Sequence, residues 1–120
     1  MSTRRSDKNE YVCYIFVNSD LKMGNGKKIA QSMHVAIELI KDLNTKSDYV
    51  KQCFDVWSET GHKTVVLKAT EAQMNSIYDM YPSVRIHDAG RTQVTSGSFT
   101  MLGLYPKLTE PDFSSFKLHS

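Results

Sequence analysis

Residues 11–17, YVCYIFV, constrain the fold of this chain more than any other part of its sequence. Every residue of the run is apolar, and most are β-branched or aromatic, which is typical of a strand covered on both faces. The run is far shorter than the roughly 20 apolar residues of a membrane-spanning helix. It therefore predicts the central strand of a sheet that has helices packed against both sides.

Three helices are predicted from the spacing of apolar residues after this strand. The first ends near Leu43, and its apolar face recurs at helical spacing: Ile29, Met33, Ala36, Ile37 and Ile40. Residues 49–58 carry an aromatic stripe that we expect to pack on the sheet, and Gly61 is suited to end that helix. Thr70 and Gln73 have the spacing of a capping box and predict the start of a third helix.

Short β-branched segments separate these helices, and residues 64–69, 84–87 and 100–104 predict further strands. The order strand, helix, helix, strand, helix, strand, loop, strand predicts an α/β fold. We expect a single three-layer α/β/α domain with a small, mostly parallel mixed four-stranded sheet. At 120 residues the chain has room for one such domain. The expected divisions are a polar N-terminal tail over 1–10, the domain over 11–108, and a loosely attached C-terminal tail over 109–120.

Composition narrows the setting of this domain. Cys13 and Cys53 lie in a predicted strand and a predicted helix, where we expect reduced, buried thiols rather than a disulfide. The polar first residues lack the apolar core of a secretion signal and argue against a membrane anchor, so we expect a cytoplasmic protein with no membrane partner. The formal net charge is only +2, so any affinity for nucleic acid must come from local clusters of basic residues.

Two loops follow the carboxyl ends of predicted strands, at the edge where open α/β sheets bind ligands. The loop over residues 18–28 carries Lys22, Lys27 and Lys28 around two glycines at the start of a helix, which favours the binding of phosphate groups. Its spacing is too short for a Walker loop, and no Ser or Thr follows the lysine. Alternatively, the same residues form an ordinary solvated entry to the helix.

The loop over residues 88–98 is the denser of the two in functional groups. With its flanks it reads IHDAGRTQVTSGSFT, and it combines an acid, an arginine, several hydroxyl side chains and two glycines directly after a strand. Polar groups so concentrated at the end of a strand are costly to bury, which favours an active or binding site. A turn-rich connection of Gly and Ser is the alternative interpretation of the same composition.

Both loops carry motifs that occur together, in the same order, in one known family. The motifs are DLKMGNGKKIAQSMH, then Trp57 and Gly61 before KTVVLKA, and then HDAGRTQVTSGSFTMLGLYP. From Tyr11 to Pro106 they resemble the signature segments of the peptidyl-tRNA hydrolase 2 family. The segment DAGRTQ, followed by Gly, Thr and LG, is the most specific part of the match. The chain departs from the usual pattern at Asn25, Ser32, Met33 and Ser96.

The resemblance implies hydrolysis of the ester between a stalled peptide and the terminal ribose of tRNA, which releases free tRNA for reuse. The family's catalytic set corresponds to Lys22, Asp88, Thr92 and Thr100. We expect Asp88 to orient or deprotonate a water, Lys22 to stabilise negative charge, and the two threonines to position water or substrate. A threonine nucleophile is the alternative, although neither threonine has an assured base beside it.

A second set of residues is expected to contact the substrate: Lys27, Lys28, Gln31, His34 and Arg91. Most of the candidates also have a purely structural interpretation. Asp88 suits a turn, Lys22 a solvated loop, and Thr100 an ordinary strand. In the same way, His34 is typical of a structural helix histidine, and Arg91 could brace its own loop through an ion pair.

The expected partner is peptidyl-tRNA, and six basic residues could form one face toward it: Arg4, Arg5, Lys22, Lys27, Lys28 and Lys63. The resemblance also implies a homodimer. We expect no DNA partner and no cofactor. We also expect no metal, because the histidines show no ligand spacing with Cys or carboxylates. Two other functions stay open: an inactive relative that binds RNA or protein, and a nucleotide- or phosphate-binding protein that uses the MGNGKK loop.

Overall fold

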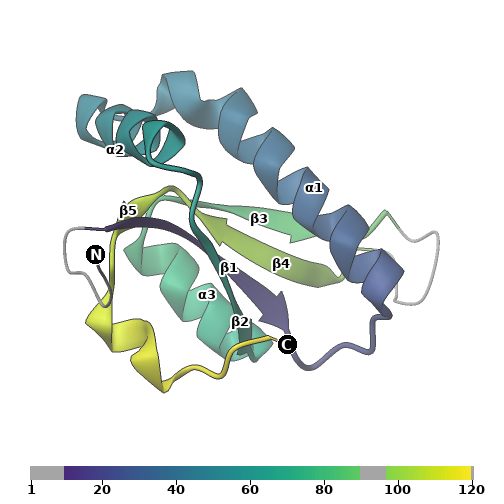
Figure 1. Ribbon diagram of the computed structural model, residues 1–120. Helices are drawn as coiled ribbons and strands as arrows, with labels where there is room; N and C mark the ends of the chain where they lie inside the picture. Colours follow the sequence, from purple (N-terminus) through teal and green to yellow (C-terminus); the bar gives the residue numbers. More distant parts are fainter. Residues whose placement is uncertain (1–9, 90–96, 120) are drawn as a thin grey trace.

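The computed structural model describes residues 10–89 and 97–119, which fold around one central sheet (Figure 1). The elements are β1 (Tyr11–Asn18), α1 (Asn25–Asp42), α2 (Asp48–Glu59), β2 (Thr64–Ala69), α3 (Glu71–Met80), β3 (Ser83–His87), β4 (Phe99–Leu104) and β5 (Lys107–Leu108), with short 3-10 helices at Leu43–Thr45 and Pro111–Ser115. The strand order is β2-β1-β4-β3, and β5 pairs with β1 off this path. The YVCYIFV run therefore lies inside the sheet, as predicted.

The sheet is mixed in direction. β1 pairs with β2 in parallel, whereas β4 runs antiparallel to both β1 and β3. It follows that β1, β2 and β3 share one direction, and that their carboxyl ends lie at the same edge of the sheet. The predicted α/β class and mixed sheet are confirmed, with the short strand β5 added to the four strands that were expected.

The continuous apolar run of β1 is explained by two separate cores. Alternate residues of β1, including Tyr14 and Phe16, enter a core with Met74 and Ile77 of α3. The residues between them enter a second core, on the face that α1 and α2 cover. Figure 1 shows α1 and α2 on one side of the sheet and α3 on the other, which is the predicted three-layer arrangement.

The side of α1 that faces the sheet differs from the expected one. Its buried residues are Gln31, Val35 and Leu39. The apolar stripe predicted from the sequence lies outside, with Ile29 and Met33 exposed at 69% and 66%. A close approach at one point explains the rotation, because a Cβ atom placed on Gly103 of β4 would lie 2.2 Å from Val35 Cγ1. Only glycine at this position lets α1 sit so near the sheet.

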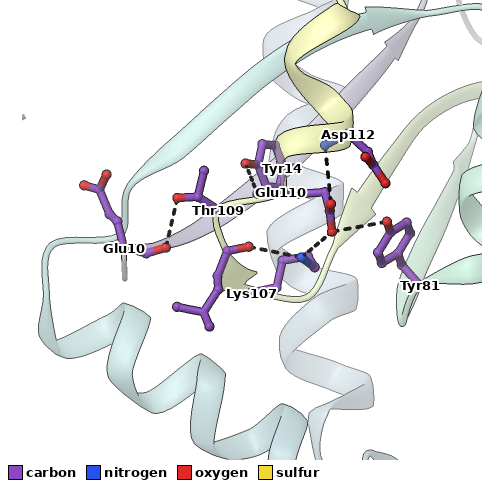
Figure 2. Close-up of polar contacts among 8 residues, drawn as sticks. Glu10, Tyr14, Tyr81, Lys107, Thr109, Glu110 and Asp112 are labelled. Atoms are coloured by element: carbon purple, nitrogen blue, oxygen red, sulfur yellow. Dashed lines mark hydrogen bonds and ion pairs between the residues drawn. The ribbon is translucent and has the colours of Figure 1, made fainter. Parts of the chain in front are cut away.

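The C-terminal segment is packed against the domain, so the prediction of a loosely attached tail was wrong. Phe113 is buried in the first core, and Leu118 forms a strand bridge with Leu67 of β2. Figure 2 shows the polar contacts that anchor the start of this segment. The Glu110 carboxylate accepts hydrogen bonds from Lys107 Nζ at 2.9 Å and from the Tyr81 hydroxyl at 3.3 Å. A buried aromatic side chain and a paired carboxylate together hold the segment in place.

The remaining expectations of local structure are met where the structure describes the chain. Thr70 and Gln73 form both hydrogen bonds of the predicted capping box. Cys13 and Cys53 are free and buried, as expected. Across the described ranges, no helix combines the length and the apolar character needed to cross a bilayer.

Candidate functional site

The two loops singled out in the sequence meet at an ion pair between Lys27 and Asp88. Lys27 lies in the first turn of α1, and Asp88 comes directly after β3. The two side chains are only 9% and 1% exposed. Burial of this kind is costly for charged groups unless they are paired, so the contact fixes both side chains in one arrangement.

Backbone hydrogen bonds set the position of Asp88. Its N–H donates to the carbonyl oxygen of Ser98 at 2.9 Å, and its own carbonyl accepts from the N–H of Gly97 at 2.8 Å. Gly97 has a φ of 87°, in the region that favours glycine. The base of the loop is thereby closed on both strands, and the carboxylate is held toward α1.

Thr100 in β4 is completely buried. Its hydroxyl lies 2.6 Å from Gln31 Oε1 and 3.1 Å from the carbonyl oxygen of Ile86, so both are acceptors for the one hydroxyl proton. Gln31 is also buried, yet it lines the cavity described next. Thr100 can therefore act on a bound molecule through Gln31 rather than by direct contact.

An open hollow of about 730 Å³ lies between α1 and β3 and reaches Asp88. The α1 side contributes Gly26, Lys27, Ala30, Gln31, His34 and Glu38, and the β3 side contributes Arg85, Ile86, His87, Asp88 and Ala89. Of the expected substrate contacts, Lys27, Gln31 and His34 are thus brought together with Asp88. The combination of a carboxylate, an ammonium group and amide and imidazole side chains is one that can bind and hydrolyse a carbonyl compound.

Lys22 and Lys28 lie elsewhere. They line a second hollow of about 760 Å³ with Leu21, Met23 and Gly24, and Lys22 is exposed. Burial lowers the pKa of His119, and so do the charges of Lys28 and Lys68, so the C-terminal segment ends near this basic region. The lysine that contacts Asp88 is Lys27 and not Lys22. The position of Lys27 in the first turn of a helix, after two glycines, is the sequence signal that could have identified it.

Three residues of the hollow with polar side chains were not predicted as site residues from the sequence: Glu38, Arg85 and His87. The Arg85 guanidinium lies 3.9 Å from the ring centroid of Tyr78, and His87 stacks on Phe99 with centroids 5.4 Å apart. These contacts hold both side chains on the α3 side of the strand. Alternation along β3 is the only signal in the sequence that points to them.

Other candidates can be placed or set aside. The predicted catalytic Thr92 and substrate contact Arg91 lie outside the described residues. Burial raises the pKa of the Cys13 thiol to about 12, so it is not available as a thiolate nucleophile near neutral pH. Within residues 10–89 and 97–119, no three side chains of His, Cys, Asp or Glu are grouped to hold a metal ion.

Comparisons with known proteins point to one family. The sequence model of the family described as Peptidyl-tRNA hydrolase PTH2 matches residues 11–111. A peptidyl-tRNA hydrolase of Sulfurisphaera tokodaii is 35% identical over 103 residues, which cover 80% of this chain and 85% of the relative. One of Saccharolobus islandicus is 34% identical over 119 residues, covering 87% and 95%. The human mitochondrial peptidyl-tRNA hydrolase 2 is 35% identical over 107 residues, covering 83% of this chain but only 58% of the human protein.

Proposed function

This chain belongs to the peptidyl-tRNA hydrolase PTH2 family, and we propose that it cleaves peptidyl-tRNA in the hollow beside Asp88. The chain is an enzyme that hydrolyses the ester bond between peptide and tRNA and releases both. The buried ion pair between Lys27 and Asp88 is the observation that carries the choice of site. It joins the two segments that contain the most specific motifs of the sequence, and both of its residues line the hollow between α1 and β3.

In the proposed mechanism, Asp88 acts as the base. Its carboxylate takes a proton from a bound water while the water oxygen adds to the ester carbonyl carbon. The Lys27 ammonium group lies beside that carboxylate and stabilises the negative charge that develops on the carbonyl oxygen. The bond to the ribose oxygen then breaks, and the proton held by Asp88 passes to that oxygen. The products are a peptide carboxylate, after loss of the proton from the acid, and free tRNA.

Gln31 and Thr100 would orient the ester. When the Thr100 hydroxyl donates to Gln31 Oε1, the amide nitrogen of Gln31 is left to donate toward the hollow. Thr100 is then a positioning residue. For Thr92 and Arg91 the proposals remain those of the sequence: Thr92 positions the water or the substrate, and Arg91 contacts phosphate or the RNA end.

The tRNA end would lie on the second hollow, beside Lys22 and Lys28. Both lysines flank the amino-terminal end of α1, where free N–H groups and the helix dipole favour phosphate. We therefore assign charge stabilisation at the ester to Lys27 and phosphate contacts to Lys22. If so, tRNA affinity should fall with salt by about one unit of log slope for each phosphate contacted.

We further propose a cytoplasmic homodimer that recycles tRNA. The exposed stripe on α1 offers an apolar patch that a second copy could cover, comprising Ile29, Met33, Ile37 and Ile40. Sedimentation of the wild type against an Ile29→Asp variant tests this. A monomer at all concentrations in the wild type would refute the dimer.

The experiment for the activity uses peptidyl-tRNA and measures release of free tRNA. Wild-type protein should release it, an Asp88→Asn variant should not, and aminoacyl-tRNA with a free amine should be spared. An inactive relative that only binds RNA would retain peptidyl-tRNA without cleaving it. Circular dichroism confirms that the variant is folded.

A further inference from the structure

The hollow beside Asp88 runs along an open edge of the sheet. β3 is the last strand in the order β2-β1-β4-β3, so among the residues that the structure describes it has a partner strand on one side only. The lining includes the consecutive residues Arg85, Ile86, His87 and Asp88. Side chains of neighbouring strand residues point to opposite faces, so a cavity that touches all four reaches the edge of the strand.

The backbone groups on this edge can be identified from the pairing with β4. The Tyr105 N–H donates to the Pro82 carbonyl, and paired residues in an antiparallel ladder alternate between bonded and non-bonded. Val84 and Ile86 therefore direct their backbone groups toward β4, whereas Arg85 directs its own away from it.

The same holds for His87, although the register between β3 and β4 shifts between Ile86 and His87. The Asp88 N–H donates to the Ser98 carbonyl, so Asp88 turns its backbone inward and His87 turns its backbone outward. In the described parts of the chain, the N–H and C=O groups of Arg85 and His87 have no hydrogen bond outside the strand ladder. Such a row of backbone groups is a template for another strand.

The opposite wall of the hollow is a polar stripe of α1. Lys27, Gln31, His34 and Glu38 are spaced by four, three and four positions, which places them on one side of the helix. The stripe spans roughly 16 Å along the helix at about 1.5 Å per residue. Figure 1 shows α1 crossing above β3 and β4, with its amino-terminal end at the side where β3 ends.

We propose that the peptide part of peptidyl-tRNA binds in this groove as an added strand, parallel to β3, with its ester end at Asp88. The inference rests on the proposed function, because Asp88 sets the direction of the peptide. In a parallel pairing, a peptide residue level with Ile86 donates its N–H to the Arg85 carbonyl and accepts at its own carbonyl from the His87 N–H. This residue is the penultimate one, and its carbonyl is the group that blocks the amine of the terminal residue.

The arrangement supplies a reason for selecting blocked substrates. An aminoacyl-tRNA has no amide carbonyl to accept from His87, and its free ammonium group would face the N–H donor. Backbone pairing also reads no side chain, which suits an enzyme that must accept peptides of any sequence. The charges fit this division of the molecule. In the groove the carboxylates of Glu38 and Asp88 offset the cations Lys27 and Arg85, whereas the described residues that line the other hollow include Lys22 and Lys28 and no carboxylate.

The test measures kcat/KM for a series of blocked tRNA esters. N-acetyl-aminoacyl-tRNA should be cleaved, and an N-ethyl analogue of the same size without the carbonyl should be spared. In tripeptidyl-tRNA, N-methylation of the penultimate residue should lower kcat/KM about threefold to tenfold, the effect of one lost hydrogen bond. N-methylation of the terminal residue, whose N–H points away from β3, should change it less than about twofold by the same reasoning.

A protein variant tests the same pairing from the other side. Arg85→Pro removes an N–H that points away from β4, so the hydrogen bonds between β3 and β4 are kept. In the proposed pairing this N–H donates to one peptide carbonyl only, that of the residue two positions before the penultimate one. The ratio of kcat/KM for tetrapeptidyl-tRNA to that for N-acetyl-aminoacyl-tRNA should fall about threefold or more. Arg85→Ala is the matched variant, and its ratio should equal the wild-type ratio because the N–H remains.

The outcomes separate this inference from the proposed function. If the wild type cleaves no peptidyl-tRNA, the function itself fails. If it cleaves all the blocked esters, but the two N-methyl positions have equal effects and both Arg85 variants keep the wild-type ratio, the activity stands and the added strand is refuted. Each ratio compares kcat/KM for two substrates on the same variant, so a loss of activity caused by partial unfolding affects both values equally and cancels.

Discussion

Within residues 10–89 and 97–119, two pairs of a lysine and a carboxylate are partly or fully buried, and they differ in sequence separation, burial and surroundings. Lys107 and Glu110 are three residues apart in the C-terminal segment, with side chains 25% and 18% exposed (Figure 2). Lys27 and Asp88 come from elements 61 residues apart and are 9% and 1% exposed. The first pair closes a local turn, whereas the second joins two distant loops.

The surroundings of the two carboxylates show what each pair does. Glu110 also accepts from the Tyr81 hydroxyl and from the N–H of Asp112, which lies in the first turn of the short helix Pro111–Ser115. The hydrogen bond and charge of Lys107 lower the pKa of Glu110 against the opposing effect of burial. Its donors all belong to the segment and to the core edge that it anchors. Asp88 instead lines a hollow of about 730 Å³ between α1 and β3, where we propose that the substrate binds.

The largest expected effect comes from exchanging carboxylate for amide in each pair. Asp88→Asn should lower kcat by about a thousandfold, because the amide cannot take a proton from water. Glu110→Gln should leave kcat within about twofold, since it lies outside the site. Single-turnover release of tRNA measures both. Comparable losses in the two variants would mean that the Asp88 pair, like the Glu110 pair, is structural.

Replacing the lysine of each pair should also affect kcat at one pair and not at the other, although the difference in kcat should be smaller than for the carboxylates. Lys27→Met should lower kcat about a hundredfold, because it removes the charge that stabilises the oxyanion. Lys107→Met should cost about 1 kcal/mol of stability and leave turnover in place. Thermal unfolding and steady-state kinetics distinguish the two.

A third lysine variant assigns the roles on either side of α1. Lys22→Met should raise KM more than it lowers kcat, as expected for a phosphate contact. A hundredfold loss of kcat in Lys22→Met, with Lys27→Met active, would return the catalytic role to Lys22.

The Thr100 hydroxyl, which donates to Gln31, and the Tyr81 hydroxyl, which donates to Glu110, allow a comparison with smaller expected effects. Thr100→Val should lower kcat/KM about tenfold, because Gln31 loses the donor that fixes its amide, and Thr100→Ser should restore most of that loss. Tyr81→Phe removes the hydroxyl that donates to Glu110 and should leave kcat/KM unchanged. The rescue by serine is the informative readout, since a simple packing defect would be made worse by the smaller side chain.

Much of the fold follows from period and order in the sequence. The β1 run had to be covered on both faces, and the alternation of strands and helices fixed the layers and brought both loops to one edge. The pattern could not predict the rotation of α1 about its axis, which decides the face of the helix that packs on the sheet. The apolar stripe of α1 is exposed because Gly103 and the Thr100 hydroxyl favour Val35 and Gln31 against the sheet, and both of these contacts are made across more than 60 residues of chain.

The sequence predicted the position of the acidic residue Asp88 but not which lysine pairs with it. Asp88 stands in a specific motif directly after a strand, so its place at the sheet edge followed from the topology. Lys22, Lys27 and Lys28 are chemically alike and only six residues apart at most, and which of them reaches Asp88 depends on where α1 begins. The open edge of β3 was also out of reach, because strand order cannot be derived from alternation alone.

The smallest expected effect is a pH dependence of the difference in unfolding free energy between the wild type and Glu110→Gln. The pKa of Glu110 is lowered from an ordinary value of 4.5, so the folded state favours the ionised carboxylate. The stabilisation is therefore fully present above pH 4.5 and is lost as the pH falls through the lower pKa of the folded state. At pH 7, Glu110→Gln should unfold with about 1 kcal/mol less free energy than the wild type, and the difference should shrink on acidification. Urea unfolding at several pH values measures it, and a difference that stays constant down to pH 3, well below that ordinary value, would show that shape rather than charge anchors the C-terminal segment.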